Sequence, residues 1–289
     1  WAWGDSLFWG YGKDYGEIEL RKAFQAAVNK GITFLDTAEV YGLGKSEELL
    51  GKFIKETNAT TQIATKYMPL PWRFRKEDVA DAVTASLKRL KMPSIDLYQV
   101  HFPAPSFLSQ SGLMNALADQ VEQGRIKAVG VSNYNAEQLR EAHQLLARRG
   151  VPLAVNQMRY SLITREIETN GVLAAARELG VTILAYSPLA QGLLTGKYTA
   201  SNPPTGARSL DRRFQAAGLI KLQPVLAKLY ELGEKYSKTP AQVALNWLIS
   251  QPGVIPIPGI KTAAQVEQNA GALGWELSAA EVGELRYLG

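Results

Sequence analysis

Residues 32–42 read ITFLDTAEVYG, an apolar run rich in β-branched residues that ends in an aspartate and leads into a tyrosine. Runs of this kind recur along the chain and predict strands. They lie at 32–38, 61–67, 95–101, 126–132, 153–157, 181–186 and 254–258. Most of the segments between them carry apolar residues at helical spacing, as 77–91 does, so strands and helices are expected to alternate.

This alternation predicts an α/β fold of the (β/α)8 TIM-barrel class. Glycines stand between a helical pattern and the next strand, where a left-handed residue ends a helix at low cost. They are Gly31, Gly124, Gly150 and Gly180. Seven strands can be counted where the class has eight, so we expect that a first strand has been trimmed before Trp1. No linker or internal repeat is evident, and a single domain over 1–289 is predicted.

Composition narrows the classes of function. The 289 residues are 46% hydrophobic, enough for a substantial core, and 32 basic residues face 27 acidic ones. No block of like charge indicates a nucleic-acid partner, and the small positive excess suits an anionic cofactor. No apolar run approaches the roughly 20 residues of a membrane helix, and no signal segment is evident, so a soluble protein is predicted. The chain has no cysteine, which excludes thiol catalysis.

Four ionisable side chains stand at or just beyond the ends of three predicted strands: Asp36, Tyr41, Lys66 and His101. A parallel barrel brings the carboxyl ends of its strands to one mouth, where these groups would meet. Burying Asp36 or Lys66 alone is costly, so a pair is expected. An adjacent ammonium should draw the pKa of Tyr41 from about 10 toward operating pH and make the phenol a proton donor. A purely structural salt bridge is the alternative.

His101 ends the strand 95–101, whose period of two places it on the same side of the sheet as Gln99. The imidazole would then face the barrel mouth. A core histidine with satisfied hydrogen bonds is the alternative interpretation. Two histidines, no cysteine and no H-E-x-x-H motif predict no metal site.

The chain contains neither G-x-G-x-x-G nor a true Walker loop, which argues against a Rossmann domain. Polar and aromatic groups instead end several strands and would suit a carboxamide on a flat ring. They are Ser132, Asn133, Gln157, Tyr186 and Ser187. Capping of strand ends is the alternative. The last strand, VIPIPGIK, places Gly259 and Lys261 before a helix, an arrangement that favours phosphate, although a solvated lysine is the other possibility.

Nearly the whole chain resembles the aldo-keto reductases in its sequence motifs and in their order. The motifs are GITFLDTAEVYG, ATKY, DLYQVHFP, IKAVGVSN, AVNQ, AYSPLAQGLLTGKY and VIPIPG. The resemblance implies a (β/α)8 barrel that binds NADPH/NADP+ across the strand ends without a Rossmann fold. Asp36, Tyr41, Lys66 and His101 match the catalytic tetrad of that family. The segments WAWGD, PWRF and NPPTG are most similar to bacterial and plant-plastid members.

The same resemblance implies the cofactor contacts. Ser132, Asn133 and Gln157 match positions that hold the nicotinamide carboxamide, and Tyr186 matches the residue stacked on its ring. The loop over the pyrophosphate corresponds to Ser187, Leu189, Gln191, Gly192, Leu193, Lys197 and Arg208. The adenosine end with its 2′-phosphate corresponds to Lys261, Gln265, Gln268 and Asn269. Many relatives have arginine at the position of Gln265, and its loss predicts a shallower preference for NADPH.

The expected function is therefore NADPH-dependent reduction of an aldehyde or ketone to an alcohol, with Tyr41 as general acid. Trp3, Trp72, Phe74 and Phe102 are candidates for an apolar substrate pocket, with core packing as the alternative. Two other functions stay open: a cofactor-binding regulatory or scaffold subunit resembling the potassium-channel β subunits, and a phosphate-handling barrel isomerase. The expected partner is a small carbonyl compound. The expected location is the cytoplasm, or the plastid stroma if a transit segment was removed.

Overall fold

The computed structural model of the chain describes residues 2–6, 10–103, 108–199, 201–204, 209 and 211–289. The chain forms two compact units. The first comprises Trp1–Met158, Ile167–Leu184 and Gly259–Ala263, and the second comprises Arg159–Glu166, Ala185–Pro258 and Ala264–Gly289.

The first unit is built on a parallel sheet whose strands follow one another in chain order. They are β1 (Phe34–Asp36), β2 (Gln62–Tyr67), β3 (Ile95–Val100), β4 (Ile126–Ser132), β5 (Leu153–Arg159) and the start of β6 (Thr182–Tyr186). The register pairs Lys66 with Gln99 and Ser132 with Gln157. Polar residues near the ends of neighbouring strands are thereby brought level with one another.

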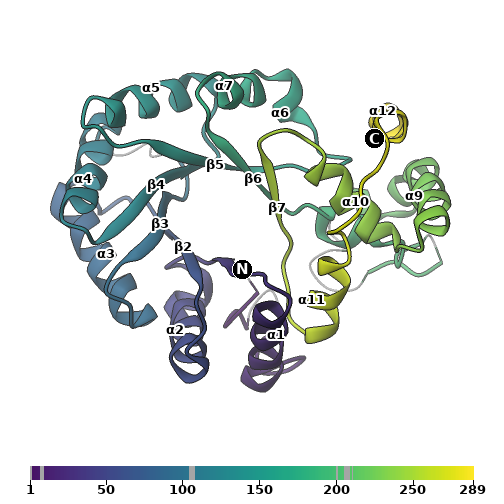
Figure 1. Cartoon of the computed structure of the whole chain (residues 1–289), viewed down its shortest axis with the longest axis horizontal. Coiled ribbons are helices and arrows are strands. Elements are labelled where there is room, and N and C mark those ends of the chain that lie inside the picture. Colours follow the sequence, from purple (N-terminus) through teal and green to yellow (C-terminus); the bar gives the residue numbers. More distant parts are fainter. Residues whose placement is uncertain (1, 7–9, 104–107, 200, 205–208, 210) are drawn as a thin grey trace. The chain divides into compact units, whose positions relative to one another are not determined.

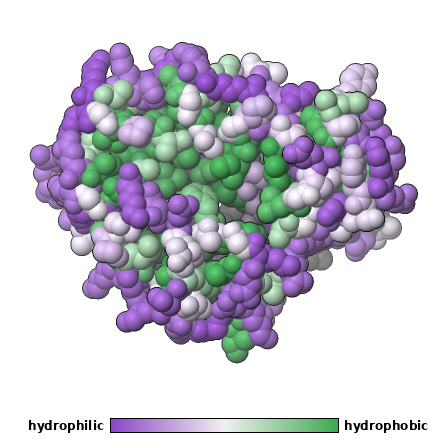
Figure 2. Space-filling model, viewed as in Figure 1, coloured by the Kyte–Doolittle hydropathy of each residue, from purple (hydrophilic) through white to green (hydrophobic). Residues whose placement is uncertain are grey.

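Helices flank this sheet, as Figure 1 shows for α2 to α5 beside β2 to β5. The helices of this unit are α1 (Glu17–Asn29), α2 (Lys45–Thr57), α3 (Lys76–Leu90), α4 (Gln110–Glu122), α5 (Ala136–Ala147) and α7 (Val172–Glu178), with α6 (Glu166–Thr169) at its border. In α3, Val79, Val83 and Leu90 are buried as their spacing predicts, whereas Leu87 is half-buried. Hydrophilic residues cover the helices at the rim, and hydrophobic residues gather over the strands (Figure 2).

The alternation of strands and helices along the chain agrees closely with the sequence patterns. Each of the seven predicted strand ranges contains or overlaps an observed strand, including β7 (Val254–Ile257) in the second unit. The glycines Gly31, Gly124, Gly150 and Gly180 all have positive φ, between 67° and 74°. The helices therefore end where the sequence predicts.

The second unit is largely helical in the residues that the structure describes. It contains α8 (Ala216–Lys221), α9 (Gln223–Tyr236), α10 (Pro240–Ile249), α11 (Ala263–Ala270) and α12 (Ala279–Leu288). The 3-10 turns η2 (Ala190–Thr195) and η4 (Arg212–Phe214) lie among the described residues of the long segment 187–216. Ser278 caps α12 by accepting a hydrogen bond from the Glu281 backbone N–H.

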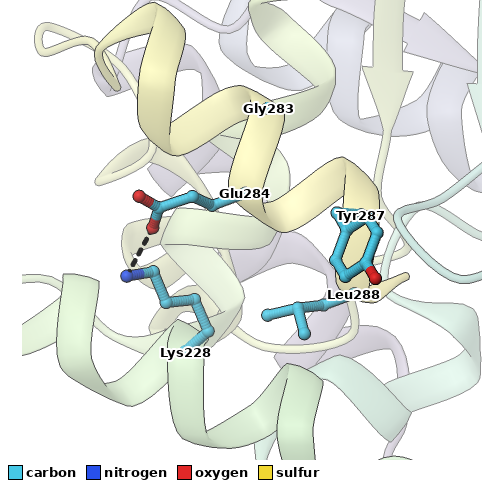
Figure 3. Close-up of a pocket in the computed structure, with 5 residues that line it drawn as sticks. All are labelled: Lys228, Gly283, Glu284, Tyr287 and Leu288. Atoms are coloured by element: carbon cyan, nitrogen blue, oxygen red, sulfur yellow. Dashed lines mark ion pairs between the residues drawn. The ribbon is translucent and has the colours of Figure 1, made fainter.

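A shallow surface pocket lies between α9 and α12 within the second unit (Figure 3). Lys228 and Glu284 form an ion pair of 2.6 Å at its edge. The other lining residues are Gly283, Tyr287 and Leu288. None of the residues predicted to take part in the functional site lines it, so we place no function there.

Candidate active site

The centre of the site is the side chain of Lys66, fully buried on β2. Its Nζ donates to Asp36 Oδ2 at 2.5 Å, to the Thr37 carbonyl at 2.7 Å and to the Tyr41 hydroxyl at 3.4 Å. The three donors of the ammonium group are thus all directed to oxygen. Burial alone would lower the pKa of Lys66, but Asp36 and Tyr41 together, through charge and hydrogen bonds, outweigh this and raise the pKa. The lysine is therefore a paired, charged group.

Tyr41 follows β1 at the start of the 3-10 segment η1 (Tyr41–Gly44). Within η1 the backbone is left-handed at Gly42 and Leu43, so the chain turns sharply beside the phenol. The Tyr41 ring lies 5.0 Å from Lys66 Nζ and 5.6 Å, edge to face, from the His101 ring. The phenol therefore lies close to both an ammonium group and an imidazole.

Burial raises the pKa of Tyr41, and the positive charge of Lys66 only partly offsets this effect. The net direction is opposite to the one expected from the sequence. Lysine does lower the pKa, as expected, but the extent of burial, which the sequence does not show, outweighs it. Tyr41 is consequently a phenol that holds its proton at neutral pH.

His101 directly follows β3 and is 9% exposed. Burial, reinforced by the charge of Lys66, lowers its pKa to about 3, so the imidazole is neutral at physiological pH. Its Nδ1 has no hydrogen-bond partner among the described residues. A satisfied core histidine would have one, so this observation favours a functional histidine. The Phe102 ring stacks on the imidazole with centroids 5.1 Å apart.

Two glutamines hold the other oxygen of Asp36. Gln157 Nε2 donates to Asp36 Oδ1 at 2.8 Å, and Gln99 Nε2 donates to the same atom at 3.1 Å. Gln157, expected at a nicotinamide carboxamide, thus also belongs to the network around the carboxylate. Gln99 was not among the predicted site residues. Its position on the same strand face as His101 is the signal that could have identified it.

Ser132 and Asn133 lie at the end of β4. The Ser132 hydroxyl donates to the Gln157 carbonyl at 3.0 Å and accepts from Asn133 Nδ2 at 3.0 Å. The same Asn133 amide donates to the His101 carbonyl at 3.1 Å. These contacts are the strand-end capping that was the alternative for both residues, and they fix a polar cluster next to His101.

The remaining predicted cofactor residues fall in both units. Gly259 and Lys261 belong to the first, where Lys261 Nζ lies 4.4 Å over the Tyr15 ring. The second unit holds Tyr186, Ser187, Leu189, Gln191, Gly192, Leu193, Lys197, Gln265, Gln268 and Asn269. Arg208 lies outside the described residues.

Within the second unit, the loop after β6 has an unusual backbone. Ala190, Gln191 and Gly192 are successive residues with positive φ. The Ala190 and Gly192 N–H groups donate to the Ser187 and Leu189 carbonyls at 2.8 Å and 2.9 Å, so hydrogen bonds within the loop hold this backbone. Gly192 has a φ of 104°, which L side chains rarely adopt, and an added Cβ would lie 3.3 Å from the Tyr198 ring, so any substitution there is strained. Lys197 Nζ lies 4.7 Å from that ring and adds a positive charge nearby.

The aromatic residues considered for a substrate pocket differ clearly in their exposure. Trp3 is only 8% exposed; its indole N–H donates to the Ile260 carbonyl and its ring packs against Phe53, so it belongs to the core. Trp72 and Phe74 are 67% and 52% exposed, and Phe102 is 44% exposed beside His101. These three can contact a substrate. Core packing, the alternative, is therefore correct for Trp3.

The described part of the chain lacks two kinds of feature. No helix there is long and apolar enough to cross a membrane. No group of three or more His, Cys, Asp or Glu side chains there is arranged to hold a metal ion.

Comparison with known proteins identifies the family. The profile of the Aldo/keto reductase family matches residues 5–288, nearly the whole chain. The chain is 42% identical over 299 residues to the chloroplastic pyridoxal reductase of Arabidopsis thaliana, covering 99% of this chain and 80% of that protein. It belongs to the aldo/keto reductase family of oxidoreductases, which confirms the resemblance seen in the sequence.

Solved structures agree. A glycerol dehydrogenase from Gluconobacter oxydans superposes with a TM-score of 0.86 at 30% identity, over 94% of this chain and 85% of that one. An aldo-keto reductase from Klebsiella pneumoniae in complex with NADPH has a TM-score of 0.76 at 29% identity, with the same coverage. The predicted (β/α)8 fold class is thereby confirmed.

Proposed function

We propose that this protein is an NADPH-dependent reductase that converts an aldehyde or ketone to an alcohol, with Tyr41 as the proton donor. One observation carries the proposal. The Tyr41 hydroxyl lies 3.4 Å from a fully buried lysine that is itself 2.5 Å from Asp36, and the ring of the neutral His101 lies 5.6 Å from the Tyr41 ring. A mere salt bridge would need neither the phenol nor the imidazole.

Each side chain has a distinct task. Tyr41 retains its proton until the carbonyl oxygen gains negative charge, and the O–H bond then breaks as the proton passes to that oxygen. The phenolate that remains is stabilised by the adjacent Lys66 ammonium group. Asp36 keeps the lysine charged and is itself oriented by Gln99 and Gln157.

His101 orients the substrate. Because its pKa is lowered to about 3, the imidazole is neutral and one of its ring nitrogens carries a proton that can be donated to the carbonyl oxygen. A protonated imidazole would instead add a second positive charge beside Lys66. Exclusion of water by the buried surroundings strengthens these interactions.

The residues present fit a nicotinamide dinucleotide. Ser132, Asn133 and Gln157 provide a buried polar cluster for a carboxamide. Lys197, which follows the turn at 190–192, carries a positive charge that suits a pyrophosphate. When bound, NADPH supplies the hydride that reduces the carbonyl carbon. The NADPH complex of the Klebsiella pneumoniae relative supports this assignment.

Gln265, which is exposed on α11, cannot form the charged fork that arginine offers a 2′-phosphate, so we expect some use of NADH.

The substrate is a small carbonyl compound that contacts Phe102 and the exposed Trp72 and Phe74. The pyridoxal reductase among the relatives makes pyridoxal a first candidate. That relative is chloroplastic, which supports the plastid stroma beside the cytoplasm as a proposed location.

The test is a panel of pyridoxal, sugars, aromatic aldehydes and short reactive aldehydes, read as loss of NADPH absorbance and as formation of the alcohol. We expect turnover with at least one member, and NADPH should quench tryptophan fluorescence. Quenching without turnover of any carbonyl would favour a scaffold subunit, and absence of quenching would contradict the cofactor assignment.

A further inference from the structure

A second ion pair joins the segments that follow β1 and β2. Arg73 Nη1 donates to Glu39 Oε1 at 2.5 Å, and Nη2 donates to Glu39 Oε2 at 3.1 Å. Two parallel bonds of this kind fix geometry as well as charge. The side chain of Glu39 is 7% exposed and that of Arg73 is 20% exposed. The pair is therefore a largely buried, bidentate contact and not a solvated surface bridge.

Both members of the pair also hold the backbone of Met68. The Met68 N–H donates to Glu39 Oε1 at 2.6 Å, and its carbonyl accepts from Arg73 Nη1 at 3.0 Å. The Arg73 guanidinium lies 5.0 Å over the ring of Tyr67, which is fully buried. Since Tyr67 and Met68 follow Lys66 directly, the pair is anchored to the chain that carries the lysine.

On the other side, the pair is anchored to the chain that carries the phenol. Glu39 precedes Tyr41 by two residues, and its backbone N–H donates to the Lys66 carbonyl at 3.4 Å. The ladder between β1 and β2 ends with Asp36 opposite Ala64, so Tyr41 lies beyond the register of the strands. Its distance of 3.4 Å to Lys66 is the longest of the three lysine contacts. The pairing of β1 with β2 therefore does not fix the distance between the Tyr41 hydroxyl and Lys66 Nζ.

We propose that Glu39 and Arg73 are positioning residues that hold the Tyr41 hydroxyl against Lys66. The inference rests on the proposed function, in which that contact stabilises the phenolate. The pair acts through Tyr41 and does not touch the substrate. Without it, the segment 37–44 and the segment 67–73 can separate, and the phenol moves away from the ammonium group.

The test compares Arg73→Lys and Glu39→Gln with Arg75→Lys. Arg75 lies in the same loop and pairs with Asp78, but its side chain is 64% exposed. Displacing a reacting group by about 1 Å can cost roughly 100-fold in rate. We therefore expect kcat to fall roughly 10- to 100-fold in both pair variants, with the Kd of NADPH, read from tryptophan quenching, within twofold of the wild type. The solvent deuterium isotope effect on kcat should rise, because proton transfer becomes slower. Arg75→Lys should change none of these values.

Two results would overturn the positioning role. One is kcat within twofold of the wild type in Arg73→Lys, the variant that keeps the charge and is the safer of the two for folding. The other is a fall in kcat with an unchanged isotope effect, which a merely structural role would produce. Tyr41→Phe is measured alongside: if it is inactive while the pair variants are normal, only the positioning role fails. If Tyr41→Phe stays active, the proposed function fails as well.

Discussion

At the scale of single residues, the site depends on one buried charge that is neutralised locally. Lys66 is 0% exposed and Asp36 is 12% exposed, so removing either partner leaves the other charge in a poor environment. For Lys66→Met we expect the free energy of unfolding to fall by about 3–5 kcal/mol. Chemical denaturation would measure it.

The double variant Asp36→Asn with Lys66→Met is the matched control. It removes both charges, so it should recover much of the lost stability without recovering reductase activity. If the double variant were no more stable than Lys66→Met, the buried charge would not be the cause of the destabilisation.

His101 gives a pH dependence of stability. Its pKa is lowered to about 3 in the folded protein, against an ordinary value of 6.5, so the unfolded chain binds more protons between these values. The contribution of His101 to the free energy of unfolding is complete above pH 6.5. It is lost as the pH falls toward 3, at no more than about 1.4 kcal/mol per pH unit. The slope of unfolding free energy against pH, measured between pH 6.5 and 5, should therefore be smaller in His101→Gln. Equal slopes in the two proteins would contradict a neutral buried imidazole.

At the scale of elements, close packing of the helices stabilises the fold that carries the site. Gly51 on α2 faces the end of α3, where an added Cβ would lie 2.4 Å from the Leu90 carbonyl oxygen. Gly51→Ala should therefore cost about 1–3 kcal/mol through overpacking and lower the midpoint of thermal unfolding. Gly283 on α12 is the control, since an added Cβ there meets nothing within 4 Å. Gly283→Ala should raise stability by about 0.5–1 kcal/mol, and similar effects of the two substitutions would contradict this account.

The elements were predictable because their signals are local. Apolar, β-branched runs such as 126–132 locate β4, and Ser278 marks the start of α12. The turns inside η1 and η2 were not predicted, because left-handed backbone at residues such as Leu43 and Gln191 has no composition signal. These turns shape both the position of the phenol and the loop after β6.

The site was predictable only to the level of residue identity. Asp36, Tyr41, Lys66 and His101 were identified, and the structure brings all four together within the first unit. The bonds from Gln99 and Gln157 to Asp36 depend on register across several strands, which a single sequence does not show. The direction of the pKa of Tyr41 depends on burial, which likewise emerges only from the packed chain.

At the scale of the whole molecule, family membership and chemistry agree. The family profile covers 5–288, and the structure brings Asp36, Tyr41, Lys66 and His101 together within the first unit. A single domain over 1–289 stays a prediction. In the proposed function, Lys66, Asp36 and the Glu39 and Arg73 pair all act through the Tyr41 phenol, so Tyr41 is the residue to test.

The most direct measurement is kcat for carbonyl reduction by Tyr41→Phe at saturating NADPH, with NADPH affinity read from tryptophan quenching in the same preparation. Loss of a positioned general acid typically costs about 10²- to 10⁴-fold. We expect a loss of at least that size with the Kd of NADPH within twofold of the wild-type value. A Tyr41→Phe protein that reduces the same carbonyl at the wild-type rate would contradict the account.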